Sequence, residues 1–132
     1  MSTEQNIEAV KKAYSDFGRQ DMASLMGVFD ETIVWATPDI GIPPGGTYRG
    51  KAEVARFFQQ VDDIWEFQEF EPRNYIAAGD QVAVQGYYAF TSKETRKSGT
   101  SDWVMVWTFK NGKCTAFQEY VDTAALRDVL SK

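Results

Sequence analysis

A carboxylate near the end of the chain is a candidate for exchanging a proton with a bound molecule. The segment KCTAFQEYVDTAAL, residues 113–126, has the pattern of a β-strand that leads into a helix cap. Alternation along the strand predicts two faces, one with Thr115, Phe117, Glu119 and Val121, the other with Cys114, Ala116, Gln118 and Tyr120. In an apolar interior, desolvation would raise the pKa of Glu119 toward neutrality and suit it to acid or base catalysis.

Two other interpretations of Glu119 stay open. The carboxylate could accept hydrogen bonds from a nearby Tyr, Trp or backbone group and hold the strand ends together. A β-bulge could also shift the alternation by one residue, which would put Tyr120 inside instead.

Two further residues could take part in acid–base chemistry. Tyr14, in a predicted first helix, could donate its phenol proton to a developing oxyanion. Asp39 lies in the Pro/Gly-rich loop PDIGIPPGGTYRG and could act as a displaced base or belong to a lid. A solvated aspartate in a turn is the simpler interpretation of Asp39.

Aromatic side chains are abundant enough to line a pocket as well as fill a core, with four Trp, six Tyr and nine Phe. The predicted ligand-binding residues are Phe17, Trp35, Thr37, Phe57, Trp103, Met105, Trp107 and Phe117. A filled core made of the same residues is the alternative.

Composition excludes several kinds of chemistry. The chain has no His and one Cys, which excludes His-based triads, histidine metal sites, cysteine zinc sites and intrachain disulfides. We therefore expect no metal and no cofactor. The net charge of −5 argues against nucleic acid, and no apolar run is long enough to cross a bilayer, so we predict a soluble, cytoplasmic protein without a membrane partner.

The elements that must position these residues follow from periodicity and turn signals. Ser2 and Asp21 are predicted to cap two N-terminal helices. The remaining predictions are a strand over 31–37, a loop over 38–50, a helix over 51–64, strands over 65–78, 81–91, 100–109 and 114–121, and a final helix capped by Asp122. Pro72 predicts an edge or a bulge in its strand, and Asn111-Gly112 predicts a hairpin turn.

This order predicts a single α+β domain over residues 1–132, with helices and an antiparallel sheet segregated from each other. The strand 100–109 is apolar on both faces, one with Trp103 and Met105 and the other with Val104 and Val106. The helices can cover only one of these faces. A second copy of the chain is the simplest cover for the other, so we predict a homodimer through the outer sheet face.

Three segments carry a family resemblance: QDMASLMGVFDETIVW, TYRGKAEVARFF and FKNGKCTAFQEYVDTAAL. Together they resemble the SnoaL-like branch of the nuclear transport factor 2-like superfamily, which includes ketosteroid isomerase and limonene epoxide hydrolase. The resemblance implies a cone-shaped fold in which N-terminal helices wrap a curved antiparallel sheet, a deep apolar cavity, and usually a dimer.

The catalytic residues of these relatives are mostly not carried over. In ketosteroid isomerase the base, the protonated acid and the tyrosine donor lie at positions that correspond here to Thr37, Met105 and Ala13. Tyr14 directly follows Ala13 in the chain. One acid of limonene epoxide hydrolase corresponds to Glu119, but its arginine has no counterpart, and Asp102 alternates away from the Trp103 face.

The sequence therefore predicts that the chain binds a small apolar molecule in an aromatic cavity. Metal-free acid–base chemistry by a single carboxylate would fit, of the isomerase, cyclase, dehydratase or hydratase type, on a polyketide-like or terpenoid-like compound. The alternative is a ligand-binding or dimerisation module without catalysis.

Overall fold

The computed structural model describes residues 2–42 and 44–132 of the chain. Within these residues the helices are α1 (Thr3–Gly18), α2 (Met22–Met26), α3 (Gly50–Ile64) and α4 (Thr123–Leu130). The strands are β1 (Phe29–Thr37), β2 (Gly46–Arg49), β3 (Trp65–Ala78), β4 (Gln81–Ser92), β5 (Ser98–Lys110) and β6 (Lys113–Val121). None of the described helices is both long enough and apolar enough to span a membrane.

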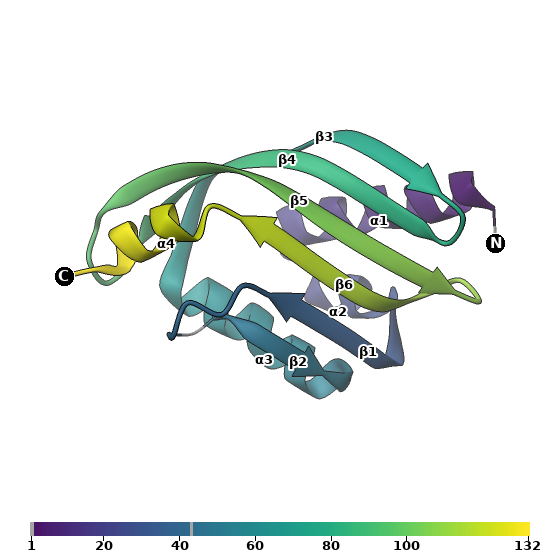
Figure 1. Cartoon of the computed structure of the whole chain (residues 1–132). Coiled ribbons are helices and arrows are strands. Elements are labelled where there is room, and N and C mark those ends of the chain that lie inside the picture. The colour runs from purple at the N-terminus through teal and green to yellow at the C-terminus, as the bar shows by residue number, and fades with distance from the viewer. Residues whose placement is uncertain (1, 43) are drawn as a thin grey trace.

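The strands form one curved sheet in the order β2-β1-β6-β5-β4-β3 (Figure 1). Strands β3 to β6 are antiparallel neighbours, as the sequence predicts. The prediction of a wholly antiparallel sheet is wrong, because β1 runs parallel to β6. The prediction of a loop over 38–50 is also wrong in part: Gly46–Arg49 forms β2 and pairs with β1. A strand this short, among so many Pro and Gly residues, has no pattern by which the sequence could distinguish it from a loop.

The helix ends carry the predicted caps. Ser2 forms a reciprocal capping box with Gln5, and the carboxylates of Asp21 and Asp122 accept hydrogen bonds from the backbone N–H groups of Ser24 and Ala125. These local bonds fix where the chain enters α1, α2 and α4, so the helices start at the residues that the sequence predicts.

A buried aspartate that the sequence did not single out joins α1 to α2. Asp16 is 1% exposed, and its carboxylate accepts hydrogen bonds from Lys12 Nζ at 2.8 Å, Arg19 Nη2 at 2.6 Å and Ser24 Oγ at 2.9 Å. The hydrogen bond from Lys12 comes first among the causes that lower the pKa of Asp16, and burial opposes it. The ionised carboxylate thus holds the two helices at a fixed angle beside the sheet.

Register shifts in two strand pairs determine which side chains of the sheet face the helices. The edge strand β3 shifts its register between Phe67 and Glu69 and again between Pro72 and Asn74, so the prediction from Pro72 is confirmed. In the β5–β6 pair, Thr108 lies opposite Ala116 but Phe109 lies opposite Cys114.

Thr115 is therefore the extra residue of a bulge. The prediction that Thr115 faces inward and Cys114 outward is wrong, since Cys114 is fully buried. The bulge lies before Phe117, so the alternation that follows it is unaffected.

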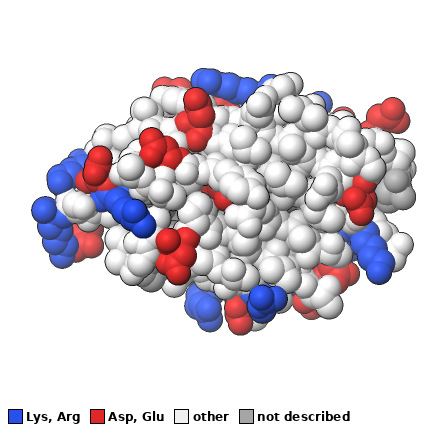
Figure 2. Space-filling model, in the orientation of Figure 1, with Lys and Arg blue, Asp and Glu red and all other residues white. Residues whose placement is uncertain are grey.

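The helices α1, α2 and α3 all lie behind the sheet in Figure 1, and α4 lies at one end of it, so no helix of the described residues covers the centre of its other face. Figure 2 shows this outer face: its centre is largely uncharged, and most acidic and basic side chains lie toward the margin. The concave face and the helices enclose the hydrophobic core, which includes Ile33, Val54, Val84 and Phe109.

Candidate functional site

A small cavity of about 100 Å³ lies between the helices and the concave face of the sheet. Nearly all of its wall is apolar and aromatic. The lining residues are Ala13, Tyr14, Phe17, Leu25, Trp35, Thr37, Pro38, Pro44, Phe57, Phe58, Val61, Trp65, Phe67, Phe70, Tyr88, Phe90, Met105, Trp107, Glu119 and Leu126. Helix α4 contributes Leu126, so the C-terminal segment closes part of the cavity.

Glu119 is the one acidic side chain among the described residues that line this cavity. It reaches the cavity because residues 117–121 of β6 keep their alternation, which turns Tyr120 outward with 58% of its surface exposed. Burial raises the pKa of the Glu119 carboxyl from 4.5 to about 7, and a hydrogen bond from Tyr88 opposes that rise. Both protonation states are therefore populated near neutral pH.

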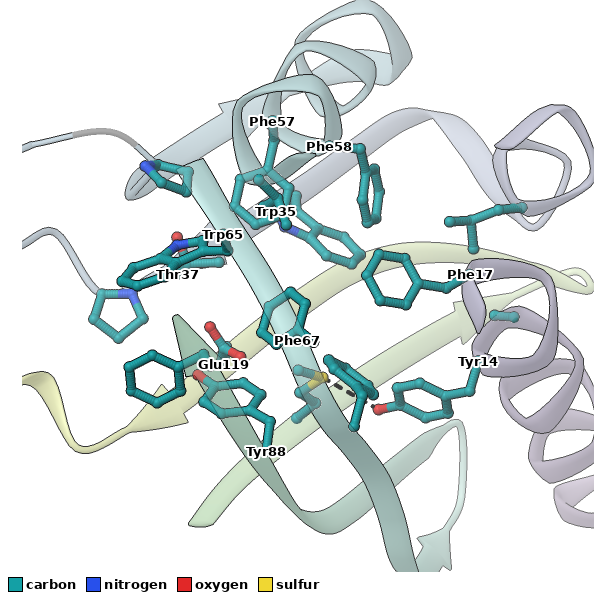
Figure 3. A pocket seen from close by; sticks show the side chains of 18 of the residues that line it. Tyr14, Phe17, Trp35, Thr37, Phe57, Phe58, Trp65, Phe67, Tyr88 and Glu119 are labelled. Carbon is teal, nitrogen blue, oxygen red and sulfur yellow. Dashed lines mark hydrogen bonds between the residues drawn. The ribbon is translucent and has the colours of Figure 1, made fainter. Parts of the chain in front are cut away.

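The Tyr88 hydroxyl lies beside the Glu119 carboxyl, with Thr37 and Trp65 on the same side of the cavity (Figure 3). Burial, and then the negative charge of Glu119, raise the pKa of Tyr88 above its usual value, so Tyr88 stays protonated and can donate. Among the described residues, the hydrogen bond of the Thr37 hydroxyl is a long one, of 3.5 Å, to the Gly46 carbonyl oxygen. These groups give the cavity one polar end.

Tyr14 lines the cavity from α1, away from this polar end (Figure 3). Its hydroxyl accepts a hydrogen bond from Trp107 Nε1 at 3.1 Å and donates to Met105 Sδ at 3.3 Å. A thioether sulfur is a weak acceptor, so a ligand oxygen could replace it as the acceptor of this hydrogen bond. Burial is the main cause that raises the pKa of Tyr14, which keeps the phenol protonated.

The predicted site residues do not all reach the cavity. Those that line it are Glu119, Tyr14, Phe17, Trp35, Thr37, Phe57, Met105 and Trp107. Phe117 lies one layer behind and stacks on Trp35, with ring centroids 3.6 Å apart, and Trp103 packs behind Tyr14 and Phe70.

Asp39 is exposed, and its carboxylate accepts a hydrogen bond from the Gly41 backbone N–H at 2.9 Å. The structure thus brings Asp39 into a surface turn and not into the cavity. From this turn, Asp39 cannot act as the displaced base that the sequence suggests.

Sequence reasoning missed several lining residues, of which Tyr88 matters most. The missed aromatic residues are Phe58, Trp65, Phe67, Phe70, Tyr88 and Phe90. Alternation in QVAVQGYYAFT gives a signal for Tyr88, since it shares a face with Val82, Val84 and Phe90. Trp65 and Phe67 alternate in the same way at the start of β3.

The arrangement is suited to one proton transfer inside an apolar wall. One carboxyl group with a pKa near 7 can give or take a proton, and two neutral phenols can donate hydrogen bonds to oxygen atoms of a ligand. Among residues 2–42 and 44–132, no three His, Cys, Asp or Glu side chains cluster so that they could hold a metal ion.

Comparisons with known proteins agree with this fold. The sequence model of the SnoaL-like domain matches residues 10–117. An NTF2-like protein of Burkholderia xenovorans has 34% identity and a TM-score of 0.91, with 99% of each chain covered. An NTF2-like protein of unknown function from Burkholderia pseudomallei has 29% identity and a TM-score of 0.89, with 100% of each chain covered.

A third similar structure is that of TerC, which was co-crystallised with polyporic acid. It has 29% identity and a TM-score of 0.86, and the alignment covers 95% of this chain and 97% of TerC. None of the curated proteins matches this chain.

Proposed function

The chain belongs to the SnoaL-like domain family, and we propose that it binds a small, largely apolar molecule in its aromatic cavity and moves a proton on that molecule through Glu119. The observation that carries this proposal is the carboxyl group of Glu119, which lines the cavity with a pKa of about 7. A general acid or base is most effective when its pKa lies near the working pH.

The two phenols support a reaction at a carbonyl or enol oxygen. Tyr88 stands beside Glu119, so it can orient the carboxyl group or bind an oxygen of the substrate next to it. The Tyr14 hydroxyl donates its hydrogen bond to a weak acceptor, Met105 Sδ. It could donate that hydrogen bond instead to a ligand oxygen on which negative charge develops. Enolisation, cyclisation, dehydration and hydration can each use such a set of groups.

The apolar wall supports a polyketide-like or terpenoid-like substrate, since rings such as Trp35, Phe57 and Trp107 bind a carbon skeleton by burial and stacking. The likeness to TerC, which was co-crystallised with polyporic acid, supplies a first probe.

The competing function is a binding module that holds the same kind of ligand without changing it. Wild type, Glu119→Gln and the control Glu8→Gln would each be incubated with a host metabolite extract and followed by mass spectrometry. Glu8 is the control because it is exposed on α1 and does not line the cavity.

Catalysis predicts that a compound disappears with wild type and with Glu8→Gln but is only retained by Glu119→Gln. A binding module predicts that all three proteins retain the same compound unchanged. If none of them changes or retains any compound, and polyporic acid does not quench the tryptophan fluorescence of the wild type, the proposed function is wrong.

We further propose that the outer face of the sheet forms a homodimer. No helix of the described part of the chain covers the centre of this face, and that centre is largely uncharged (Figures 1 and 2). Val104 and Val106 are half-buried there, and Ile76 and Tyr120 are exposed by 52% and 58%. An exposed sheet face with few charged side chains and half-buried valines near its centre suits contact with a second copy of the chain, which would cover it.

A further inference from the structure

The cavity is too small for the class of ligand that its chemistry favours. Its volume is about 100 Å³. Small-molecule sites usually measure about 300–1,000 Å³, and an apolar void of about 150 Å³ holds one benzene molecule. The cavity as it stands therefore has room for at most one ring, whereas a polyketide-like or terpenoid-like compound has several.

A second hollow lies directly beside the cavity. It is an open groove of about 810 Å³ between the end of α1 and α2 on one side, α3 on another, and the first half of β3. Helix α3 lines it with Ala55, Phe58, Gln59, Val61 and Asp62. Ala55 and Asp62 each lie three or four residues from Phe58 and Gln59, so these four side chains share one side of the helix.

The groove and the cavity share one wall. Seven residues line both hollows: Tyr14, Phe17, Phe58, Val61, Trp65, Phe67 and Phe70. Figure 3 shows Phe17, Phe58 and Phe67 converging from α1, α3 and β3. The ring centroids of Phe17 lie 6.0 Å from Phe58, 6.4 Å from Phe67 and 5.2 Å from Phe70. We call these four phenylalanines the phenylalanine wall.

Two features make the phenylalanine wall easy to open. All four rings are half-buried, so each already has one side in the groove. Phe67 and Phe70 lie on β3, an edge strand whose register shifts between Phe67 and Glu69. A bulged edge strand has fewer neighbours to hold it in place than a central strand, so its side chains can turn at low cost.

We propose that the cavity and the groove are two halves of one binding site for an elongated ligand of two or more rings. This inference rests on the proposed function, because the first ring lies in the cavity beside Glu119. The phenylalanine wall swings aside to admit the ligand and then packs against its middle. The remaining rings lie in the groove along Ala55 and Phe58.

The rim of the groove indicates which end of the ligand lies outside. Asp62, Glu66 and Lys93 bring both signs of charge to it, and Gln59 and Gln68 add neutral amides. Lys93 Nζ donates to the Asp62 carbonyl oxygen, and Arg96 pairs with Glu66 at 3.5 Å. Because these charges are mixed and partly paired, the outer end of the ligand carries neutral polar groups such as hydroxyls and not a strong net charge.

The experiment compares a one-ring probe, phenol, with a two-ring probe, 4-phenylphenol, by tryptophan fluorescence titration. Ala55→Trp places a large ring in the groove from an exposed helix position without touching the cavity. Ala52→Trp is the matched control, because Ala52 is exposed on the same helix and lines neither hollow.

We expect Ala55→Trp to weaken binding of 4-phenylphenol at least tenfold and to leave phenol affinity unchanged, while Ala52→Trp changes neither. If 4-phenylphenol binds Ala55→Trp as tightly as wild type, or if Ala52→Trp weakens it equally, the shared site is wrong although the cavity still binds its ligand. If wild type binds neither probe nor polyporic acid, the proposed function fails and this inference fails with it.

Discussion

Glu119 lies directly opposite Met105 in the antiparallel pairing of β5 and β6, and Met105 Sδ accepts the hydrogen bond of Tyr14. Directly opposed residues of a sheet have Cβ atoms about 4.5–5.5 Å apart. The candidate acid–base group and the candidate phenol donor are thus separated by a side chain that has no proton to exchange. A ligand above Met105 would touch both.

The pH dependence of stability tests whether Glu119 is desolvated. The pKa of Glu119 is raised in the folded state to about 7 from 4.5, so between these values the folded protein keeps a proton that the unfolded chain has released. Stability is then fully present below pH 4.5 and falls by about 3 kcal/mol as the pH rises to 7. The chain has no His to add its own titration in this interval.

Glu119→Gln should remove this fall and be more stable than wild type at pH 8, whereas Glu8→Gln should keep it. Urea unfolding at pH 5 and pH 8 measures the difference. A wild type whose stability is flat over this interval would show that Glu119 is solvated.

Tyr88→Phe tests the contact beside the carboxyl group. The Tyr88 hydrogen bond opposes the rise in the pKa of Glu119, so its removal should push that pKa higher than in wild type. Carbon-13 NMR of glutamate-labelled protein, with Glu119→Gln for assignment, measures the titration. Tyr75→Phe on β3 serves as the control, and the contact has no influence if both variants titrate like wild type.

Tyr14→Phe tests the bonds across the cavity. The variant leaves the buried Trp107 Nε1 without its acceptor, which should lower the free energy of unfolding by about 1–2 kcal/mol. Met105→Leu removes only the weak sulfur acceptor and should cost less. Urea unfolding of both variants checks the order, and an equal loss would mean that the Trp107 bond contributes nothing.

Gly86→Ala tests the packing under the aromatic layer. Gly86 lies opposite Trp103, and a Cβ there would come within 2.3 Å of the indole ring. Overpacking of this kind costs about 1–3 kcal/mol, so the melting temperature should fall clearly. Gly18→Ala, where an added Cβ meets no atom within 4 Å, should change stability little in the same calorimetric scan.

Val106→Lys tests the proposed dimer. A lysine in the centre of the outer sheet face would bury a charge between two copies, so light scattering at micromolar concentration should report a monomer. Thr100→Lys, exposed nearer the start of the same strand, should leave the dimer intact. A wild type that is already monomeric at this concentration would overturn the proposal.

The sequence alone determined the features that depend on near neighbours in the chain. The caps at Ser2, Asp21 and Asp122 and the turn at Asn111-Gly112 follow from local hydrogen bonds and backbone preferences. Pro72 marked an edge strand because it has no N–H to give to a ladder.

Only the tertiary structure decided which distant residues meet. Strand β2 and the parallel β1–β6 pair depend on pairing between segments far apart in the chain, for which no local pattern exists. The bulge at Thr115 put Cys114 inside, and its place before Phe117 decided that the alternation at Glu119 survived.

The contact of Tyr88 with Glu119 and the small volume of the cavity were likewise beyond the sequence. Periodicity tells which face of a strand a side chain occupies, because that is set by the backbone of the strand itself. How closely side chains from different elements approach, and what space they leave, is set by packing among all of them at once.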